Sequence, residues 1–304
     1  MKLTIALTIA LANAVMTASC VGQNTDDNAN IYCPDTVITY YNTTAFVPEI
    51  PDSMIFAGQT ISFDTDDMIE RLDRELLSFS SSAQTSILIL KKAPRLLGKM
   101  KEILRQEGVP EDMVYVAVIE SNLLQSARSG VGAAGYWQFM EGTAREFGLT
   151  VTESVDERYD IEKATHAACR YMKSAYSRFK DWIAVAAAYN AGMGRINGHL
   201  NSQNVGSIFD VWMNNETSRY IFRILAAKIL VESPEKLGFD VPADRVYKET
   251  PYRVVVVNSS IANLNVWAQA HGATYRQLKS MNMWLRSSRL DNRNGKKYEI
   301  HLPI

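Results

Sequence analysis

The chain has 304 residues, of which 47% are hydrophobic and 10% aromatic, so it is long and apolar enough to fold around a sizeable core. Its formal net charge of -1 leaves no positive excess to neutralise phosphates, which argues against a nucleic-acid partner. We therefore expect one large domain, with something small beside it, that acts on a neutral or mixed-charge partner.

The first 20 residues, MKLTIALTIALANAVMTASC, predict an export signal. One lysine precedes an apolar run that is too short and too rich in small residues for a stable membrane span. The stretch Thr17 to Cys20 is similar to a lipoprotein cleavage box, in which Cys20 becomes the acylated first residue, so a lipid anchor is expected. The alternative is ordinary secretion after a nearby small residue. Residues 21–51, rich in Asn, Asp and Thr, predict a flexible tether.

Cysteines and histidines give no sign of a metal centre. An oxidising compartment would permit a disulfide between Cys33 and Cys169, but Cys169 lies in an alanine-rich helical run that favours a buried free thiol. The four histidines are scattered, and no cluster has metal-ligand spacing. We expect no metal and no cofactor.

Helical periodicity dominates the middle of the chain. It begins near Asp67 and resumes over residues 86–106, where Pro94 predicts a break or kink. Further helices are expected over residues 111–120, 143–149, 160–179, 182–188 and 217–232. Because their connections are short, the fold class is mainly α, a compact helical cluster over residues 52–242.

Glu120 ends one of these helices, directly after the apolar run VYVAVI. A carboxyl group in such a place loses hydration, which raises its pKa toward the range where it can deliver a proton near neutrality. A lone glutamate at a helix end is more often a solvated surface group. Glu120 therefore depends on neighbouring motifs for its interpretation as a catalytic acid.

The loop after Glu120 has the composition of a ligand-binding floor. Its glycines allow close backbone approach, Ser129 and Gln138 offer hydrogen bonds, and Tyr136 and Trp137 offer flat faces for sugar rings. Taken alone, Ser129 is more typical of a turn and Trp137 of a core. Further along, Tyr189 and Asn190 stand where a helix gives way to a glycine-bearing turn, so their polar ends can point into a cleft.

These motifs occur in a specific order: ES at Glu120, a serine nine residues later, then GAAGYWQF, TAREFGL and AAYNAG. The chain resembles the lysozyme-like lytic transglycosylases, glycoside hydrolase family 23, from about Asp66 to Phe239. The resemblance implies a lysozyme-like helical catalytic domain that cleaves peptidoglycan glycan strands. It also implies a periplasmic location in a Gram-negative bacterium, which the predicted lipid anchor would place at the outer membrane.

The resemblance also assigns roles to individual residues. Glu120 would protonate the glycosidic oxygen between N-acetylmuramic acid and N-acetylglucosamine, and then deprotonate the muramic C6 hydroxyl that closes a 1,6-anhydro ring. The remaining assignments are Ser129 and Gln138 as sugar ligands, Tyr189 as the hydroxyl positioning Glu120 or the sugar, Asn190 as the anchor of its turn, and Tyr136 and Trp137 as sugar contacts. Residues 123–125, Leu-Leu-Gln, stand where the family commonly has Phe-Asn-Pro. The resemblance therefore does not assign the details of the neighbouring sugar subsite.

After Pro242 the pattern changes to strand, helix, helix, strand. This βααβ order over residues 250–304 resembles a LysM module, which binds glycans containing N-acetylglucosamine. Leu278 and Asn282 stand at the module's usual Leu and Asn positions, whereas residues 258–260 are Asn-Ser-Ser in place of the usual Gly-Asp-Thr. A degenerate packing domain is the alternative to a glycan-binding one.

Two other functions stay open at this point. One is a hydrolase of the same fold, in which Glu141, Asp156 or Asp160 would activate water. The other is an inactive glycan-binding scaffold. For Asp156 and Asp160, helix capping is the simpler role. Protein partners cannot be read from the sequence.

Overall fold

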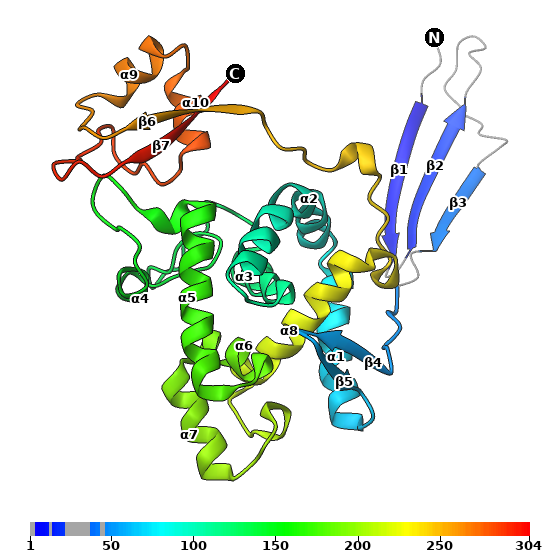
Figure 1. The fold of residues 1–304 in the computed structure, drawn as a ribbon. Helices are drawn as coiled ribbons and strands as arrows, with labels where there is room; N and C mark the ends of the chain where they lie inside the picture. The colour runs from blue at the N-terminus through cyan, green and yellow to red at the C-terminus, as the bar shows by residue number, and fades with distance from the viewer. Residues whose placement is uncertain (1–3, 12–13, 22–36, 43–45) are drawn as a thin grey trace, which may run out of the picture. The chain divides into compact units, whose positions relative to one another are not determined.

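The structure is a computed structural model that describes residues 4–11, 14–21, 37–42 and 46–304 of the chain. The chain divides into two units, Met1–Phe46 and Val47–Ile304 (Figure 1). In the first unit, β1 (Thr4–Leu11), β2 (Ala14–Val21) and β3 (Val37–Asn42) form an antiparallel sheet in that order. The predicted export signal overlaps β1 and β2, and Cys20 lies in β2 opposite Ile5. Cys33 and most of the predicted tether lie outside the described residues, although β3 falls within the tether's bounds.

The second unit begins with a hairpin and two long helices. The hairpin pairs β4 (Ser53–Phe56) with β5 (Gln59–Ser62), and α1 (Asp66–Ser81) and α2 (Ala83–Gln106) follow. The break predicted at Pro94 is wrong, because α2 continues through it as one helix of 24 residues. Pro94 is exposed while the flanking Ala93 and Leu96 are buried, so core contacts of α2 on both sides hold the helix together despite the missing N–H.

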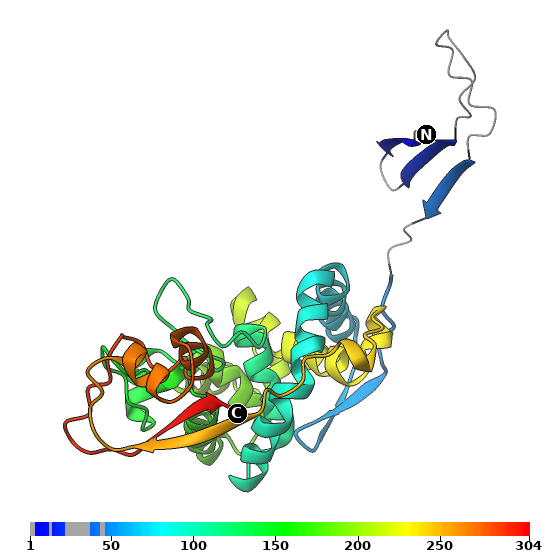
Figure 2. The same cartoon turned by 90° about the horizontal axis from the view of Figure 1, so that it is seen from above.

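The short helix α3 (Val114–Ser121) lies at the centre of the helical domain (Figure 2). It follows a 3-10 turn at Glu111–Met113, and every residue from Val114 to Ile119 is buried. A helix that is apolar all round is stable only inside a core, here between α2 and α8. The chain leaves α3 through two left-handed residues, Asn122 and Leu123, which turn it sharply into the following loop.

The other helices lie close to the ranges that the sequence predicts. Their bounds are α4 (Glu141–Glu146), α5 (Ile161–Phe179), α6 (Trp182–Ala191), α7 (Met193–Gln203) and α8 (Asn215–Glu232), with 3-10 turns η2 (Glu157–Tyr159), η3 (Ile208–Asp210), η4 (Pro234–Leu237) and η5 (Ala243–Arg245). Asp156 caps η2 and Asp160 caps α5, which confirms the capping role predicted for both. Cys169 on α5 is a buried free thiol, as expected. The helix α7 was not predicted. The mainly α fold class is confirmed.

The C-terminal module, residues 252–304, has the predicted βααβ order. Strand β6 (Tyr252–Val257) pairs antiparallel with β7 (Tyr298–Pro303), and α9 (Leu264–Ala270) and α10 (Tyr275–Met281) lie between them in sequence. Asn282 is fully buried; its side-chain amide donates to the carbonyl of His301 and accepts from the His301 N–H at 2.8 Å, so it joins the end of α10 to β7.

Candidate active site

Glu120 lies one residue from the end of α3, where the apolar helix meets the loop of residues 122–140. Burial raises the pKa of Glu120 above its ordinary value, and a hydrogen bond from Tyr220 and the charge of Arg223 offset this only in part. The nearby Glu216 carboxyl raises the pKa further. The proton on Glu120 is therefore held more tightly than on a solvated glutamate, as expected from the sequence.

Tyr220 is the direct partner of Glu120. Its hydroxyl donates to Glu120 Oε1 at 2.6 Å. Burial raises the pKa of this phenol well above its ordinary value, so it is a neutral donor. The sequence predicts the helix over residues 217–232 that carries Tyr220, but not this role. The available signal was a tyrosine on an otherwise aliphatic helix face, because a buried hydroxyl needs a partner.

Tyr189 and Asn190 stand at the end of α6, before Gly192 at φ +86°, as predicted. The Tyr189 hydroxyl donates to the carbonyl of Trp137 at 2.9 Å, so its hydrogen bond goes to the loop and not to Glu120. It still lies within electrostatic reach of Glu120, whose charge adds to the effect of burial in raising the Tyr189 pKa. The Asn190 side chain accepts from the Thr217 hydroxyl at 3.1 Å, which anchors the end of α6 to the first turn of α8.

Ser129 and Gln138 stabilise the loop of residues 122–140. The Ser129 hydroxyl accepts from the Ala133 N–H at 3.0 Å, which closes a tight turn. Gln138 has a left-handed backbone at φ +47°, and its side-chain nitrogen donates to the carbonyls of Ala127 and Gly135 at 3.2 and 2.7 Å. Both side chains are half-buried. The Ser129 proton and the Gln138 amide oxygen are the groups that these bonds leave for a ligand.

The aromatic pair in this loop requires a correction. Trp137 is 0% exposed, and its ring N–H donates to the Thr165 hydroxyl at 3.0 Å inside the helical core. It therefore offers no face to a sugar, and the core alternative considered for it is correct. Tyr136 is 4% exposed, and burial raises its pKa to about 12, with a smaller opposing effect from Arg95. Tyr136 lines a cavity described below, but a side chain that is 4% exposed does not offer the open flat face expected to stack on a sugar.

The three carboxylates considered for water activation are engaged in other contacts. Asp156 is paired with the Arg158 guanidinium through two hydrogen bonds at 2.9 and 2.7 Å. Asp160 accepts from the first N–H groups of α5. Glu141 is exposed and paired with Arg145. Burial raises the pKa of Asp160 as well as that of Glu120. Asp160 is occupied by the N–H groups at the start of α5, whereas Glu120 is hydrogen-bonded by the Tyr220 hydroxyl.

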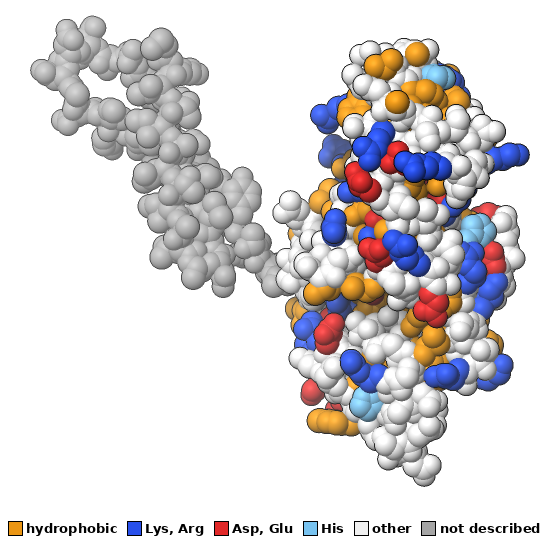
Figure 3. All heavy atoms as spheres, turned by 90° about the vertical axis from the view of Figure 1, so that its left-hand side faces the viewer, with side chains coloured by type: hydrophobic (Ala, Val, Ile, Leu, Met, Phe, Trp, Pro, Cys, Tyr) orange, Lys and Arg blue, Asp and Glu red, His pale blue; other side chains and the backbone are white. Residues whose placement is uncertain are grey.

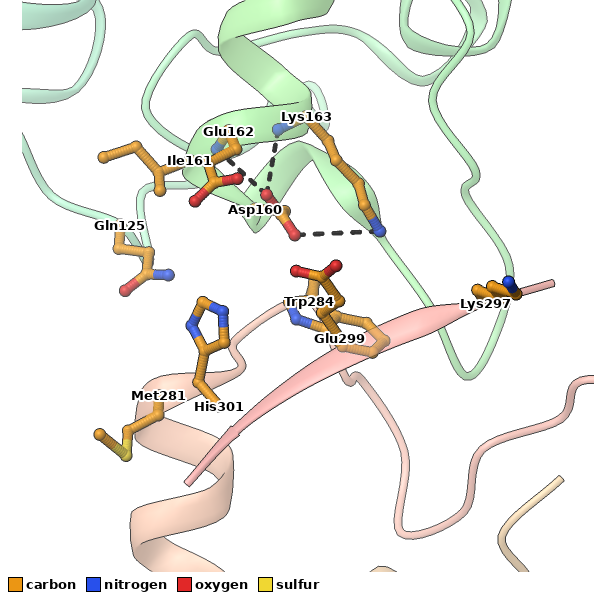
Figure 4. A pocket seen from close by; sticks show the side chains of 10 residues that line it. All are labelled: Gln125, Asp160, Ile161, Glu162, Lys163, Met281, Trp284, Lys297, Glu299 and His301. Atoms are coloured by element: carbon orange, nitrogen blue, oxygen red, sulfur yellow. Dashed lines mark hydrogen bonds and ion pairs between the residues drawn. The ribbon is translucent and has the colours of Figure 1, made fainter. Parts of the chain in front are cut away.

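Two cavities lie between the helical domain and the C-terminal module. One of about 450 Å³ is lined by Arg95, Lys99, Gln125 and Tyr136 from the helical domain, together with residues of the module. The other, of about 170 Å³, is shown in Figure 4, where Asp160 and Lys163 of the helical domain face Trp284 and Glu299 of the module. Glu120 lines neither cavity, so neither is the site of its chemistry.

A family model, the transglycosylase SLT domain, matches residues 100–210. This match spans Glu120, the loop after it and the α6 turn with Tyr189. The similarity to the SLT transglycosylase domain is shown for this stretch of the chain. A second model, the soluble lytic transglycosylase C-terminal LysM-like domain, matches residues 253–304, so the LysM-like character of the C-terminal module is confirmed as well.

Two relatives of this chain have names that state an action on murein or peptidoglycan. The chain is 28% identical over 198 residues to the membrane-bound lytic murein transglycosylase D of Escherichia coli strain K12, covering 61% of this chain and 42% of that protein. It is 33% identical over 122 residues to the peptidoglycan transglycosylase gp16 of Escherichia phage T7, covering 39% of this chain and 9% of that one. The chain thus spans less than half the length of the curated relatives it matches.

Among solved structures, the chain is similar to the soluble lytic transglycosylase SLT70 of Escherichia coli. The identity is 21% and the TM-score 0.39, covering 59% of this chain and 32% of that one.

Proposed function

We propose that this protein is a peptidoglycan lytic transglycosylase. It cleaves the β-1,4 bond between N-acetylmuramic acid and N-acetylglucosamine without water and leaves 1,6-anhydro-muramic ends. The observation that carries the proposal is Glu120: a carboxyl with a pKa raised by burial, hydrogen-bonded by a neutral phenol, inside the stretch that matches the SLT family.

The chemistry needs one carboxyl used twice. Protonated Glu120 gives its proton to the glycosidic oxygen as the bond to C1 breaks, so the N-acetylglucosamine product leaves as an alcohol. The Glu120 carboxylate then takes the proton of the muramic C6 hydroxyl, whose oxygen bonds to C1 and closes the anhydro ring. Because the attacking oxygen is tethered within the substrate, proximity replaces a second protein carboxylate. The Tyr220 hydroxyl stabilises the carboxylate between the two transfers.

Sugar binding is proposed for the loop of residues 122–140. The Ser129 hydroxyl can donate to a sugar oxygen, and the Gln138 amide oxygen can accept from a sugar hydroxyl. Tyr189 supports this loop through the Trp137 carbonyl, and Asn190 anchors the turn that presents Tyr189.

Product analysis tests the proposal. Purified protein is incubated with isolated sacculi, and the released muropeptides are analysed by mass spectrometry. We expect anhydro-muramic ends, and release should fall at least about a hundredfold in Glu120→Gln. Glu141→Gln is the matched control, because Glu141 is exposed and paired with Arg145; it should keep full activity. Reducing ends in place of anhydro ends would instead establish a hydrolase, and retained activity in Glu120→Gln would remove Glu120 from the reaction.

The location proposed is the periplasm of a Gram-negative bacterium, with the chain anchored to the outer membrane through acylated Cys20. The relatives named above include a membrane-bound enzyme, and no helix among the described residues has the length and apolarity to span a bilayer. The lipid anchor predicts that Cys20→Ala moves the protein from the membrane pellet to the soluble periplasmic fraction. If the variant and the wild type fractionate alike, the anchor is refuted.

A further inference from the structure

The C-terminal module and the helical domain share a hydrophobic core. Ala134, Val155 and Tyr159 of the helical domain are buried in one cluster with residues of the module such as Leu285 and Trp284. Residues 154–156 and the module segment around Leu285 also pair as strands do. The Asp156 N–H donates to the Trp284 carbonyl at 2.8 Å, and the Arg286 N–H donates to the Ser154 carbonyl at 2.9 Å.

A buried carboxylate, paired with two half-exposed lysines, strengthens this contact. Glu157 is 1% exposed, and its carboxylate accepts from Lys163 of α5 and from Lys296 of the module, each at 2.8 Å. Lys296 also donates to the Thr150 hydroxyl at 2.7 Å. Removing one partner from a buried carboxylate is costly, because the charge then lacks part of its compensation. Lys296 therefore ties the module to residues 150–157.

The next residue, Arg158, connects this turn to the loop of residues 122–140. One nitrogen of its guanidinium donates to the carbonyls of Gly132 and Phe139 at 2.8 and 3.0 Å, two residues between which Gln138 lies in the sequence. The Asp156 carboxylate accepts two hydrogen bonds from the same guanidinium and so fixes its orientation. The same turn also receives the Gln125 side chain, which donates to the Tyr159 carbonyl at 3.0 Å.

Backbone packing makes the connection tight. Gly135, at φ +77°, lies so close to the 156–159 turn that a Cβ atom there would stand 1.8 Å from the Arg158 carbonyl oxygen. The loop therefore rests directly on the turn that the module contacts. A shift of the turn has to move the loop, because packed backbones cannot deform independently.

From these contacts we infer that the C-terminal module positions the loop of residues 122–140 for glycan binding, and that Arg158 is the positioning residue that transmits this support. The inference concerns the site of the proposed glycan cleavage and rests on that function for its kinetic test. It assigns the module a role in the shape of the active site that is independent of any sugar the module itself binds.

The test compares two neighbouring lysines in the full-length protein. Lys296→Met removes the contact to Glu157. Lys297→Met is the matched control, because it changes an exposed lysine that directly precedes β7. In Lys296→Met we expect amide hydrogen exchange of residues 129–138 to rise about tenfold and KM for glycan strands to rise severalfold, with kcat changed less than about twofold. Lys296→Arg, which keeps a donor for Glu157, should restore most of both.

Two results would overturn the inference. One is loop exchange in Lys296→Met equal to that in Lys297→Met; the other is faster exchange with an unchanged KM, since the module would then only add stability. If Lys296→Met fails to fold, Ser154→Ala replaces it, because this removes only the hydrogen bond from the Asp291 N–H at 3.2 Å. Hydrogen exchange can be measured without activity. If the protein cleaves no glycan, the proposed function is refuted, but the exchange comparison still shows whether the module supports the loop.

Discussion

The hydroxyl of Tyr220 controls how readily Glu120 releases and regains its proton. Its hydrogen bond stabilises the carboxylate and so lowers the Glu120 pKa, against the larger effect of burial. In Tyr220→Phe that bond is lost, and the Glu120 pKa rises further. In the proposed mechanism Glu120 is protonated in the free enzyme, so the alkaline limb of kcat/KM should move to higher pH. At the same time kcat should fall about tenfold or more, because the intermediate carboxylate loses its donor. The measurement is the pH profile of glycan cleavage.

Tyr189→Phe is the natural comparison for that profile. It removes a tyrosine hydroxyl that donates to the Trp137 carbonyl and not to Glu120. We expect KM to rise, because the loop of residues 122–140 loses this support, while the alkaline limb of kcat/KM stays at the same pH. An identical shift of the limb in both variants would mean that general loosening, and not the Tyr220 hydrogen bond, sets the proton affinity of Glu120.

Short segments, and not single side chains, define the floor of the site. Gly135→Ala would force a Cβ into the Arg158 carbonyl oxygen and would also strain a residue at φ +77°. We expect a loss of roughly 3 kcal/mol or more in the free energy of unfolding, measured by urea titration. Gly130→Ala, in the same loop, is the control: a Cβ there meets nothing within 4 Å, so its stability should change by less than about 0.5 kcal/mol. A mild effect at Gly135 would show that the loop does not rest on the 156–159 turn.

Local patterns in the sequence predict most elements of this fold. Apolar periodicity predicted the helices around α3, and the capping carboxylates Asp156 and Asp160 mark the start of η2 and α5. What failed depends on contacts between distant segments. Pro94 does not break α2 because neighbouring helices hold both halves, and Trp137 turned inward because Thr165, on α5, offers its ring N–H a partner.

The same reason explains which site residues could be predicted. Glu120, Ser129, Gln138 and Tyr189 lie in short motifs whose order carries the family resemblance. Tyr220 is separated from Glu120 by 100 residues, and its role follows only from how α8 packs on α3. The link between Lys296 and Glu157 spans 139 residues, and nothing in either local sequence indicates it.

Across the protein as a whole, acidic and basic side chains are interspersed on the face of the second unit drawn in Figure 3. This fits the near-zero net charge and a substrate recognised by hydrogen bonds and shape more than by long-range attraction. In the proposed mechanism, the function of the second unit depends on how its helices hold Glu120 and the loop of residues 122–140. The number of helices that the folded unit needs is therefore a property to test.

The folded unit that supports the site begins well before residue 100, where the SLT match begins. Leu72 and Leu76 of α1 are fully buried, and α1 packs along α8. Between them, Glu75 is 1% exposed and accepts two hydrogen bonds from Arg219, the residue next to Tyr220. Without α1, the buried face of α8 would be open to water and the partner of Arg219 would be missing.

Two truncated chains test this. A chain starting at Val47 keeps the whole second unit and should unfold at the same Tm as the full-length protein, with full activity on sacculi. A chain starting at Ala83 lacks α1 and should lose at least about 5 kcal/mol of stability from its two buried leucines alone, enough to abolish cooperative unfolding. If the shorter chain instead melts within about 2 °C of the longer one and still cleaves glycan, α1 is not part of the structure that places Tyr220 against Glu120.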